Sequence, residues 1–262
     1  LYIDKREIVT LMTLGKNPEL LVIGYLYNQR FIKKAEDLKS VQVDWDVESA
    51  VVVTRGGISN LEKRLEKRTV TSGCGQGTVF GDMMEDLDKI KLNSPALRQS
   101  SFYRLLKNIR EYNEVYKKSG AVHGCALCKD EKIEIFIEDV GRHNATDAIA
   151  GYMLLEQIDG SDKLFYTTGR LTSEMVIKVA QMGIPVLFSR AGITKMGLEL
   201  SQKLGVTTIS RAAGKHFLVY NGAETVIYDA KPSEKTDSRF HSSGGSEESP
   251  VRDRRRGAQL TT

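Results

Sequence analysis

The sequence predicts an α/β protein, and the clearest sign is regular alternation in its second half. Apolar, strand-like runs at 163–167, 185–188 and 206–209 alternate with helix-like segments at 172–181 and 193–204. Short connections between such segments indicate parallel strands joined by crossover helices. A sheet flanked by helices is therefore expected.

The first part of the chain predicts a smaller mixed layer. Residues 2–14 are typical of a hairpin or strand pair, and Asn17 is placed to cap a helix that runs to about Tyr27. Clean alternation at 41–47 and the apolar run at 51–53 predict two further strands.

The middle of the chain predicts one long helix followed by a strand and a second helix. Ser94 is the expected cap of the long helix and Gly120 its end, with apolar side chains three and four residues apart between them. A strand over 133–137 and a helix over about 145–156 follow.

These segments divide the chain into three expected parts. Residues 1–70 form the smaller α/β portion, 71–228 form the main domain, and 229–262 form a polar tail that we expect to be disordered. The main domain closes with a hairpin turned at Asn221-Gly222.

Composition favours a cytoplasmic globular protein. Of 262 residues, 40% are hydrophobic, which is enough for a buried core, and the net charge of +4 indicates no strongly anionic partner. The sequence contains neither an apolar run of about 18 residues nor a leader pattern. We expect no membrane and no nucleic-acid partner.

The glycine-rich stretch from Thr71 to Thr78 holds the most reactive candidate residue. Cys74 lies there among three glycines, whose bare backbone N–H groups favour a thiolate. The alternative is a flexible turn with a buried cysteine.

Several strand-to-helix loops could hold an anion. Arg142 and His143 lie in the polar string Glu138–Asp147, where Asp139 could orient one of them; the alternative is a capping network. Arg170 lies in a second loop, whose Thr172 is a plain helix cap. The third loop is the strongest candidate for a pyrophosphate after the Cys74 loop, and its expected ligand-binding residues are Ser210, Arg211, Gly214, Lys215 and His216. A Gly-x-Gly-x-x-Gly fingerprint is absent from the sequence, which disfavours a nicotinamide enzyme.

A zinc site is a further alternative. His123, Cys125 and Cys128 with Cys74 form a possible ligand set, which would suit a hydrolase of the deaminase type. Cys125 and Cys128 could equally be a redox pair or buried small residues. Because the deaminase pattern matches poorly, we assign no metal ligands.

Taken together, these strings resemble the formate dehydrogenase accessory sulfurtransferase family, the FdhD proteins. The resemblance covers about residues 8–222, in the family's order. It is carried by the Cys74 loop, Gly120-Ala-Val-His123, Glu138-Asp-Val-Gly-Arg-His-Asn-Ala145 with Asp147, Thr168-Gly-Arg170 with Ser173-Glu174, Gly183-Ile-Pro185, and the loop to His216 before Phe217-Leu-Val-Tyr220.

The resemblance implies a cytidine deaminase-like fold and a sulfurtransferase activity. Such a protein carries persulfide sulfur from a cysteine desulfurase to the molybdenum or tungsten bis-pyranopterin guanine dinucleotide cofactor of formate dehydrogenase. Cys74 would be the carrier, the cationic loops would hold the nucleotide phosphates, and a homodimer is implied. The alternative is a chaperone that delivers the cofactor without covalent chemistry.

One position departs from the family pattern. Many members carry Cys-x-x-Cys in the first loop, whereas Gly77 holds the second position here. Cys74 is therefore the single thiol of its loop, unless Cys125 or Cys128 supplies a second one. The sequence does not choose between molybdenum and tungsten, or identify the desulfurase.

Overall fold

The computed structural model describes residues 1–58, 61 and 87–230. The described residues belong to one compact unit. The Cys74 loop and the polar tail from residue 231 lie outside the described residues, and the domain boundary near residue 70 stays a prediction. Asp229 accepts hydrogen bonds from the backbone N–H and the hydroxyl of Ser100, so contacts with the main domain extend at least that far.

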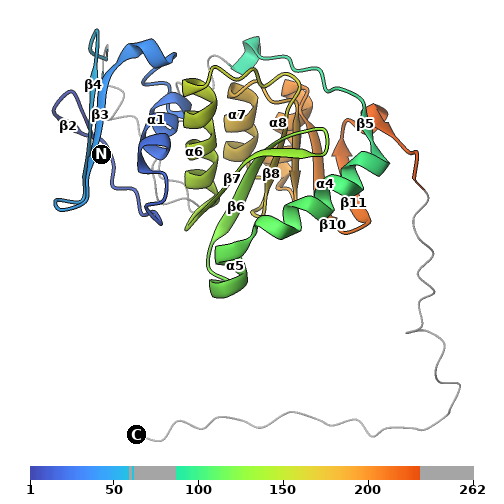
Figure 1. Ribbon diagram of the computed structural model, residues 1–262. Helices are drawn as coiled ribbons and strands as arrows, with labels where there is room; N and C mark the ends of the chain where they lie inside the picture. Colours follow the sequence, from blue (N-terminus) through green and yellow to red (C-terminus); the bar gives the residue numbers. More distant parts are fainter. Residues whose placement is uncertain (59–60, 62–86, 231–262) are drawn as a thin grey trace, which may run out of the picture. The chain divides into compact units, whose positions relative to one another are not determined.

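The amino-terminal portion is a mixed sheet covered by a helix (Figure 1). Its strands β1 (Tyr2–Ile3), β2 (Arg6–Glu7), β3 (Leu38–Asp44) and β4 (Ser49–Thr54) lie in the order β2-β1-β4-β3. Helix α1 (Pro18–Asn28) shares a core of buried apolar side chains with them. The expected small mixed layer is confirmed, although the Asn17 side chain makes no capping hydrogen bond.

The larger sheet of the described chain combines parallel and antiparallel strands. It contains β6 (His123–Lys129), β7 (Lys132–Asp139), β8 (Leu164–Thr167), β9 (Val186–Ser189), β10 (Thr207–Ala213) and β11 (His216–Asn221), in the order β11-β10-β9-β8-β6-β7. Strands β8, β9 and β10 are parallel, as the alternation predicts, whereas β6, β7 and β11 pair antiparallel with their neighbours.

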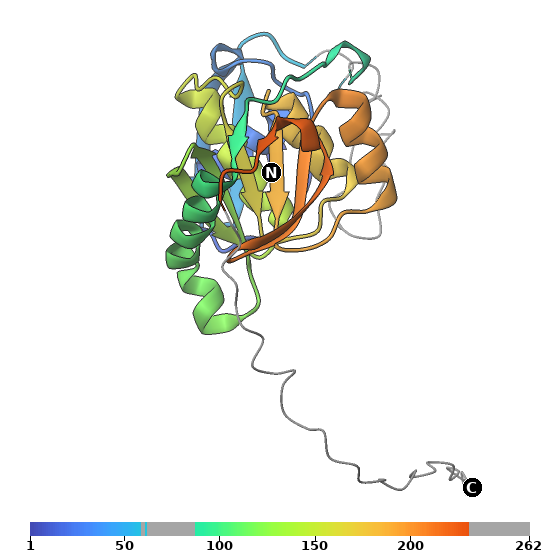
Figure 2. The ribbon, with the colours of Figure 1, turned by 90° about the vertical axis from the view of Figure 1, so that its right-hand side faces the viewer.

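Helices cover both faces of this sheet. Successive side chains of a strand point to opposite faces, and here both faces carry apolar side chains that the helices bury. Phe165 and Leu187 join the core beneath α6 (Arg142–Leu155), α7 (Ser173–Gln181) and α8 (Lys195–Leu204). Tyr166 and Phe188 join the core beneath α4 (Gln99–Tyr112) on the other face. Figure 2 shows the sheet between green α4 on one side and orange α8 on the other. The predicted fold class is confirmed.

The predicted long helix between Ser94 and Gly120 is wrong in its first part and is interrupted. Residues 97 and 98 form the short strand β5 (Leu97–Arg98), and Asn113 separates α4 from α5 (Glu114–Ser119). The Glu138 carboxylate accepts hydrogen bonds from the N–H groups of Val115 and Tyr116, which starts a new helix at this point.

Ser94 is not a helix cap. Its hydroxyl donates to the carbonyl of Pro185, just before β9, at 2.9 Å and accepts from the hydroxyl of Thr207, the first residue of β10, at 2.7 Å. Gly120, by contrast, ends α5 in the left-handed conformation, as predicted.

The predicted closing hairpin at Asn221-Gly222 is also wrong. Strand β11 pairs with β10, and β12 (Val226–Ile227) pairs parallel with β5 after a 3₁₀ turn at Ala223–Thr225. Gly222 has a φ of 80°, and a side chain there would collide with Thr207. The glycine therefore turns the chain away from β11. The other 3₁₀ turns in the described range are Ala35–Asp37 and Leu87–Lys89.

Helix α1 lies in backbone contact with α6. A Cβ atom added at Gly24 would lie 1.6 Å from the Asp147 carbonyl oxygen, and one added at Gly151 would lie 2.1 Å from that of Leu20. Only glycine permits this approach. No helix in the described segments is long and apolar enough to span a membrane.

A buried polar cluster joins α1, α6 and α7 at the same interface. Both carboxylate oxygens of Asp147 accept hydrogen bonds from Lys178 Nζ at 2.7 Å, and Asn28 Nδ2 donates to the same carboxylate at 2.7 Å. Asp147 and Lys178 are almost completely buried. A buried ion pair of this kind is costly to break, because the remaining charge has no water around it.

We predict that Lys178→Met destabilises the protein by about 3–5 kcal/mol, because Asp147 keeps a buried charge without its cation. Urea unfolding followed by circular dichroism measures the change. Lys195→Met is the matched control, since Lys195 is exposed and pairs weakly with Glu199 at 3.8 Å. Equal stability of the two variants would contradict the prediction.

Candidate functional site

Three helices begin at one edge of the larger sheet (Figure 1), and polar residues of the loops gather there. Asp139 ends β7 and pairs with His123, which begins β6, while Thr167 ends β8 and pairs with Cys125. Helices α6, α7 and α8 begin just after β7, β8 and β9 at this edge. We call this region, residues 139–143, 167–173 and 189–195, the polar edge. Helix N-termini favour anions.

Arg142 and His143 both lie in the first turn of α6, and the structure brings them to the loop that contains Arg170. A Cβ atom added at Gly169 would lie 2.3 Å from Arg142 Cδ. The arginine side chain therefore packs directly against the backbone of Gly169, in the space that a side chain would fill. His143 Nε2 lies 3.3 Å from Glu174 Oε2 in the first turn of α7. Arg170 itself is exposed.

His143 is a neutral imidazole in a cationic setting. Burial lowers its pKa well below the usual value, and the positive charges of Lys178 and Arg142 lower the pKa further. The pKa stays lowered even though the Glu174 carboxylate lies close to the ring. The ring nitrogens are thus uncharged hydrogen-bonding groups.

His123 contacts the polar edge at Thr168, whereas its residue pattern indicated a possible zinc ligand. Its Nδ1 lies 3.1 Å from Thr168 Oγ1, which also accepts a hydrogen bond from the Gly124 N–H. Burial and the nearby Arg142 lower the pKa of His123.

Asp139 does not orient Arg142 or His143, contrary to the hypothesis from the sequence. Its carboxylate accepts hydrogen bonds from Asn144 Nδ2 at 3.0 Å and from the Thr13 hydroxyl at 2.5 Å. It therefore ties the amino-terminal segment to α6. Together with the cap that Glu138 provides for α5, this makes the acidic half of the string structural.

Thr172 occupies the N-cap position of α7, but its side chain makes no capping hydrogen bond. The hydroxyl oxygen is buried and has no partner within the described ranges. The plain cap expected from the sequence is therefore incorrect. Thr194 is the residue that caps its helix, since its Oγ1 accepts from the Gly197 N–H at 3.2 Å.

Cys125 and Cys128 lie on opposite faces of the sheet. Cys125 packs in the core beneath α6–α8 and Cys128 in the core beneath α4, with a register irregularity in β6 between Leu127 and Cys128. Neither is exposed, and burial raises the pKa of Cys125 to about 11 and that of Cys128 further. These thiols cannot pair with each other across the sheet, and both stay protonated near neutral pH.

The third predicted loop is the hairpin between β10 and β11. Ser210 is fully buried in β10, and Arg211, Gly214, Lys215 and His216 are exposed. The Arg211 N–H donates to the carbonyl of Ala191, which joins the hairpin to the loop after β9.

The hairpin also borders a cavity of about 260 Å³ that the sequence did not indicate. Gly214 lines it together with Arg190, Tyr166 and Asn113. An asparagine in a helical pattern and a tyrosine in an apolar strand are ordinary core or surface residues by pattern alone. Only their convergence in space makes this a candidate site.

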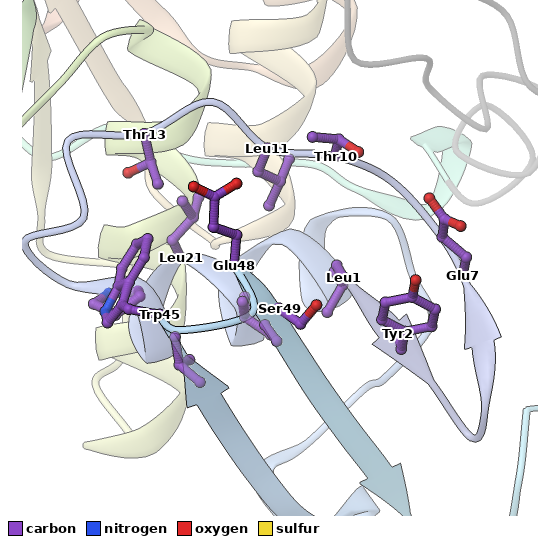
Figure 3. A pocket seen from close by; sticks show the side chains of 14 residues that line it. Leu1, Tyr2, Glu7, Thr10, Leu11, Thr13, Leu21, Trp45, Glu48 and Ser49 are labelled. Atoms are coloured by element: carbon purple, nitrogen blue, oxygen red, sulfur yellow. The ribbon is translucent and has the colours of Figure 1, made fainter.

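A separate cleft of about 170 Å³ lies in the amino-terminal portion (Figure 3). Trp45 and Leu21 form apolar walls, while Glu7 and Glu48 provide carboxylates. Acidic walls do not suit an anionic ligand, and none of the predicted site residues lines this cleft. The described residues also contain no cluster of three His, Cys, Asp or Glu side chains placed to hold a metal ion.

The fold and the polar edge thus define an α/β protein whose cationic and neutral donors converge at helix N-termini. The FdhD/NarQ family model matches residues 1–227. The chain belongs to the FdhD/NarQ family.

Its relatives include proteins named as sulfur carriers. The sulfur carrier protein FdhD of Wolinella succinogenes is 32% identical over 223 residues, covering 84% of this chain and 77% of that protein. That of Bacillus pumilus is 30% identical over 220 residues, covering 83% and 84%. The crystal structure of a protein assigned as a formate dehydrogenase accessory protein from Desulfotalea psychrophila has a TM-score of 0.69 and 26% identity, covering 86% of each chain.

We predict that His143 makes the protein less stable in mild acid. A histidine with a depressed native pKa stays neutral in the folded state, while the unfolded state takes up a proton below about pH 6.5. The contribution of His143 to the free energy of unfolding is therefore fully present above that pH, and it falls by about 1.4 kcal/mol per pH unit below it. Between about pH 7.5 and pH 5.5, His143→Gln should lose roughly 1.4 kcal/mol less than the wild type.

Urea unfolding at the two pH values measures this difference. His216→Gln, at an exposed position, is the matched control and should follow the wild type. Parallel stability curves for His143→Gln and the wild type would show that the imidazole is charged in the native state.

Proposed function

We propose that this protein is a sulfurtransferase that carries persulfide sulfur on Cys74. The donor is a cysteine desulfurase, and the acceptor is the molybdenum or tungsten bis-pyranopterin guanine dinucleotide cofactor required by formate dehydrogenase. One observation carries the choice of residue: two of the three cysteines are buried thiols with raised pKa values. Membership in a family whose relatives are named sulfur carriers supports the activity.

The first step exchanges one S–S bond for another. The Cys74 thiolate attacks the terminal sulfur of the desulfurase persulfide, and the desulfurase cysteine leaves as a thiolate. Cys74 then holds the sulfur as a persulfide anion, and no net oxidation occurs.

The second step delivers the terminal sulfur to the metal of the substrate cofactor as sulfide. It cleaves the Cys74 S–S bond and requires two electrons, which we assign to external thiols. Cys125 and Cys128 are poor sources, because each is enclosed in an apolar core and the two lie on opposite faces of β6. The hypothesis that they replace the missing thiol of the Cys74 loop is therefore disfavoured.

The nucleotide phosphates of the substrate are assigned to the polar edge and the adjoining hairpin. Arg142, His143 and Arg170 supply the first group of donors, beside the N-termini of α6 and α7. The hairpin supplies the second group, which comprises Ser210, Arg211, Gly214, Lys215 and His216. Ser210 Oγ is buried and has no hydrogen-bond partner in the described range, so a ligand group would satisfy it.

We predict that incubation with a cysteine desulfurase and cysteine adds one sulfur atom to the protein, and that Cys74→Ala abolishes this gain. Intact-protein mass spectrometry under non-reducing conditions is the measurement. Cys125→Ala and Cys128→Ala are the matched controls and should still gain sulfur, because their thiols are protonated and enclosed. Sulfur uptake by Cys74→Ala would refute the assignment.

The same variants separate sulfur transfer from non-covalent delivery of the cofactor. A chaperone without covalent chemistry would still activate formate dehydrogenase after Cys74→Ala, and would lose activation after changes at Arg142 or Lys215. A sulfurtransferase loses activation in Cys74→Ala while it keeps its affinity for the cofactor.

A further inference from the structure

The cleft of the amino-terminal portion combines an aromatic wall with carboxylates (Figure 3). Leu21 and Val22 of α1 provide a buried apolar lining. Trp45 and Glu48 lie in the short turn between β3 and β4, where the Glu48 N–H donates to the Trp45 carbonyl at 3.3 Å. Glu7 of β2 provides a second carboxylate. The cleft is thus apolar inside and negatively charged at its rim.

The Trp45 ring is exposed to solvent but held in position. Its exposed fraction is 55%, although tryptophan is usually well buried. A Cβ atom added at Gly15 would lie 3.0 Å from Trp45 Cη2, so the ring packs against the backbone of Gly15. The Gly15 N–H donates to Thr13 Oγ1 at 3.1 Å, and the Thr13 hydroxyl donates to Asp139 of the polar edge. Trp45 therefore presents a preorganised aromatic surface.

The size and surroundings of the cleft suit one side chain of a protein partner. Its volume of about 170 Å³ is well below the roughly 300–1,000 Å³ of small-molecule sites. Large apolar side chains are exposed on the same loop and turn: Met12 (76% exposed), Leu14 and Val47. Exposed apolar patches with polar rims are typical of protein–protein contacts.

The carboxylates determine the charge of the partner group. Glu48 has no ion-pair partner among the described residues, whereas Glu7 interacts electrostatically with the Leu1 amino group. A guanidinium group stacks on an indole face and also donates to a carboxylate, so arginine fits both walls. Like charges repel, so the phosphates of a cofactor do not suit this cleft. Of the two partners in the proposed function, the cleft suits the protein that donates sulfur.

We propose that this cleft docks the sulfur-donating protein by receiving an arginine side chain of that protein between Trp45 and Glu48. The guanidinium group stacks on the exposed indole face, and the aliphatic part of the arginine contacts Leu21. Because Thr13 is hydrogen-bonded to Asp139, docking here brings the donor beside the polar edge. The identity of the partner rests on the proposed function, whereas the arginine-binding cleft does not.

Fluorescence titration of the full chain tests the cleft directly, because Trp45 is the only tryptophan in the sequence. The probes are the peptide acetyl-Leu-Arg-Leu-amide and a matched peptide in which neutral citrulline replaces the arginine. We expect the arginine peptide to bind about tenfold more tightly than the citrulline peptide. Glu48→Gln should raise the Kd of the arginine peptide about threefold. Glu224→Gln, an exposed position outside the cleft, is the matched control and should leave that Kd unchanged.

The rate of sulfur uptake from a cysteine desulfurase tests the identity of the partner. At low desulfurase concentration, Glu48→Gln should lower the rate about threefold, and an excess of the arginine peptide should slow uptake by the wild type. The citrulline peptide should not slow it. At saturating desulfurase the rate of Glu48→Gln should equal that of the wild type, because the variant weakens docking and leaves the transfer step intact.

Four results would overturn the proposal. The two peptides bind equally well; ethylguanidinium alone binds as tightly as the arginine peptide, which indicates a small-molecule site; or the arginine peptide leaves sulfur uptake unchanged. The fourth is a dependence of Trp45 fluorescence on protein concentration without peptide, which places a second copy of the chain in the cleft. If the wild type takes up no sulfur while the arginine peptide still binds, the proposed function is refuted and the arginine-binding cleft stands.

Discussion

The backbone contact between α1 and α6 is the constraint on which the rest of the structure depends. Gly24 and Gly151 let the two helices approach until a single Cβ atom would collide with a carbonyl group. Asp147 then meets Asn28 and Lys178 in the same interface, so α1, α6 and α7 share one buried polar cluster. Because α6 begins at Arg142, this packing also fixes the position of the polar edge.

The polar edge has an excess of donors over carboxylates. Arg142 and Lys178 both depress the pKa of His143, while Asp139 and Glu138 are committed to structural hydrogen bonds. Apart from the Glu174 carboxylate, which lies 3.3 Å from His143, the remaining groups at these helix N-termini are neutral or positive, and such groups are complementary to phosphate. The same burial that neutralises His143 keeps Cys125 and Cys128 protonated. Burial thus has two effects here: it keeps His143 uncharged at the polar edge, and it keeps the thiols of Cys125 and Cys128 unreactive.

Much of the fold could be read from local patterns. The alternation after residue 160 predicts β8, α7, β9, α8 and β10, because each element has its own apolar period and cap or turn residues. The long helix after Ser94 could not be read correctly, since Glu138 caps its second half from a distant strand. The hairpin at Asn221-Gly222 failed for a related reason: the partner of β12 is β5, far away in the sequence.

The sequence by itself determined the fold class, the family and the chemical character of the loops, because periodicity and motif strings are local properties. It could also propose Arg142, His143 and Arg170 as anion-binding residues, since ligands bind at the loops that follow strand ends in an open α/β sheet. Only the tertiary structure decided that Cys125 and Cys128 are separated by the sheet, that His123 joins the polar edge, and that Asn113 and Tyr166 meet in one cavity. Those outcomes depend on which face of a strand each side chain occupies and on which segments the fold brings next to it. The spacing of residues along the sequence does not contain this information.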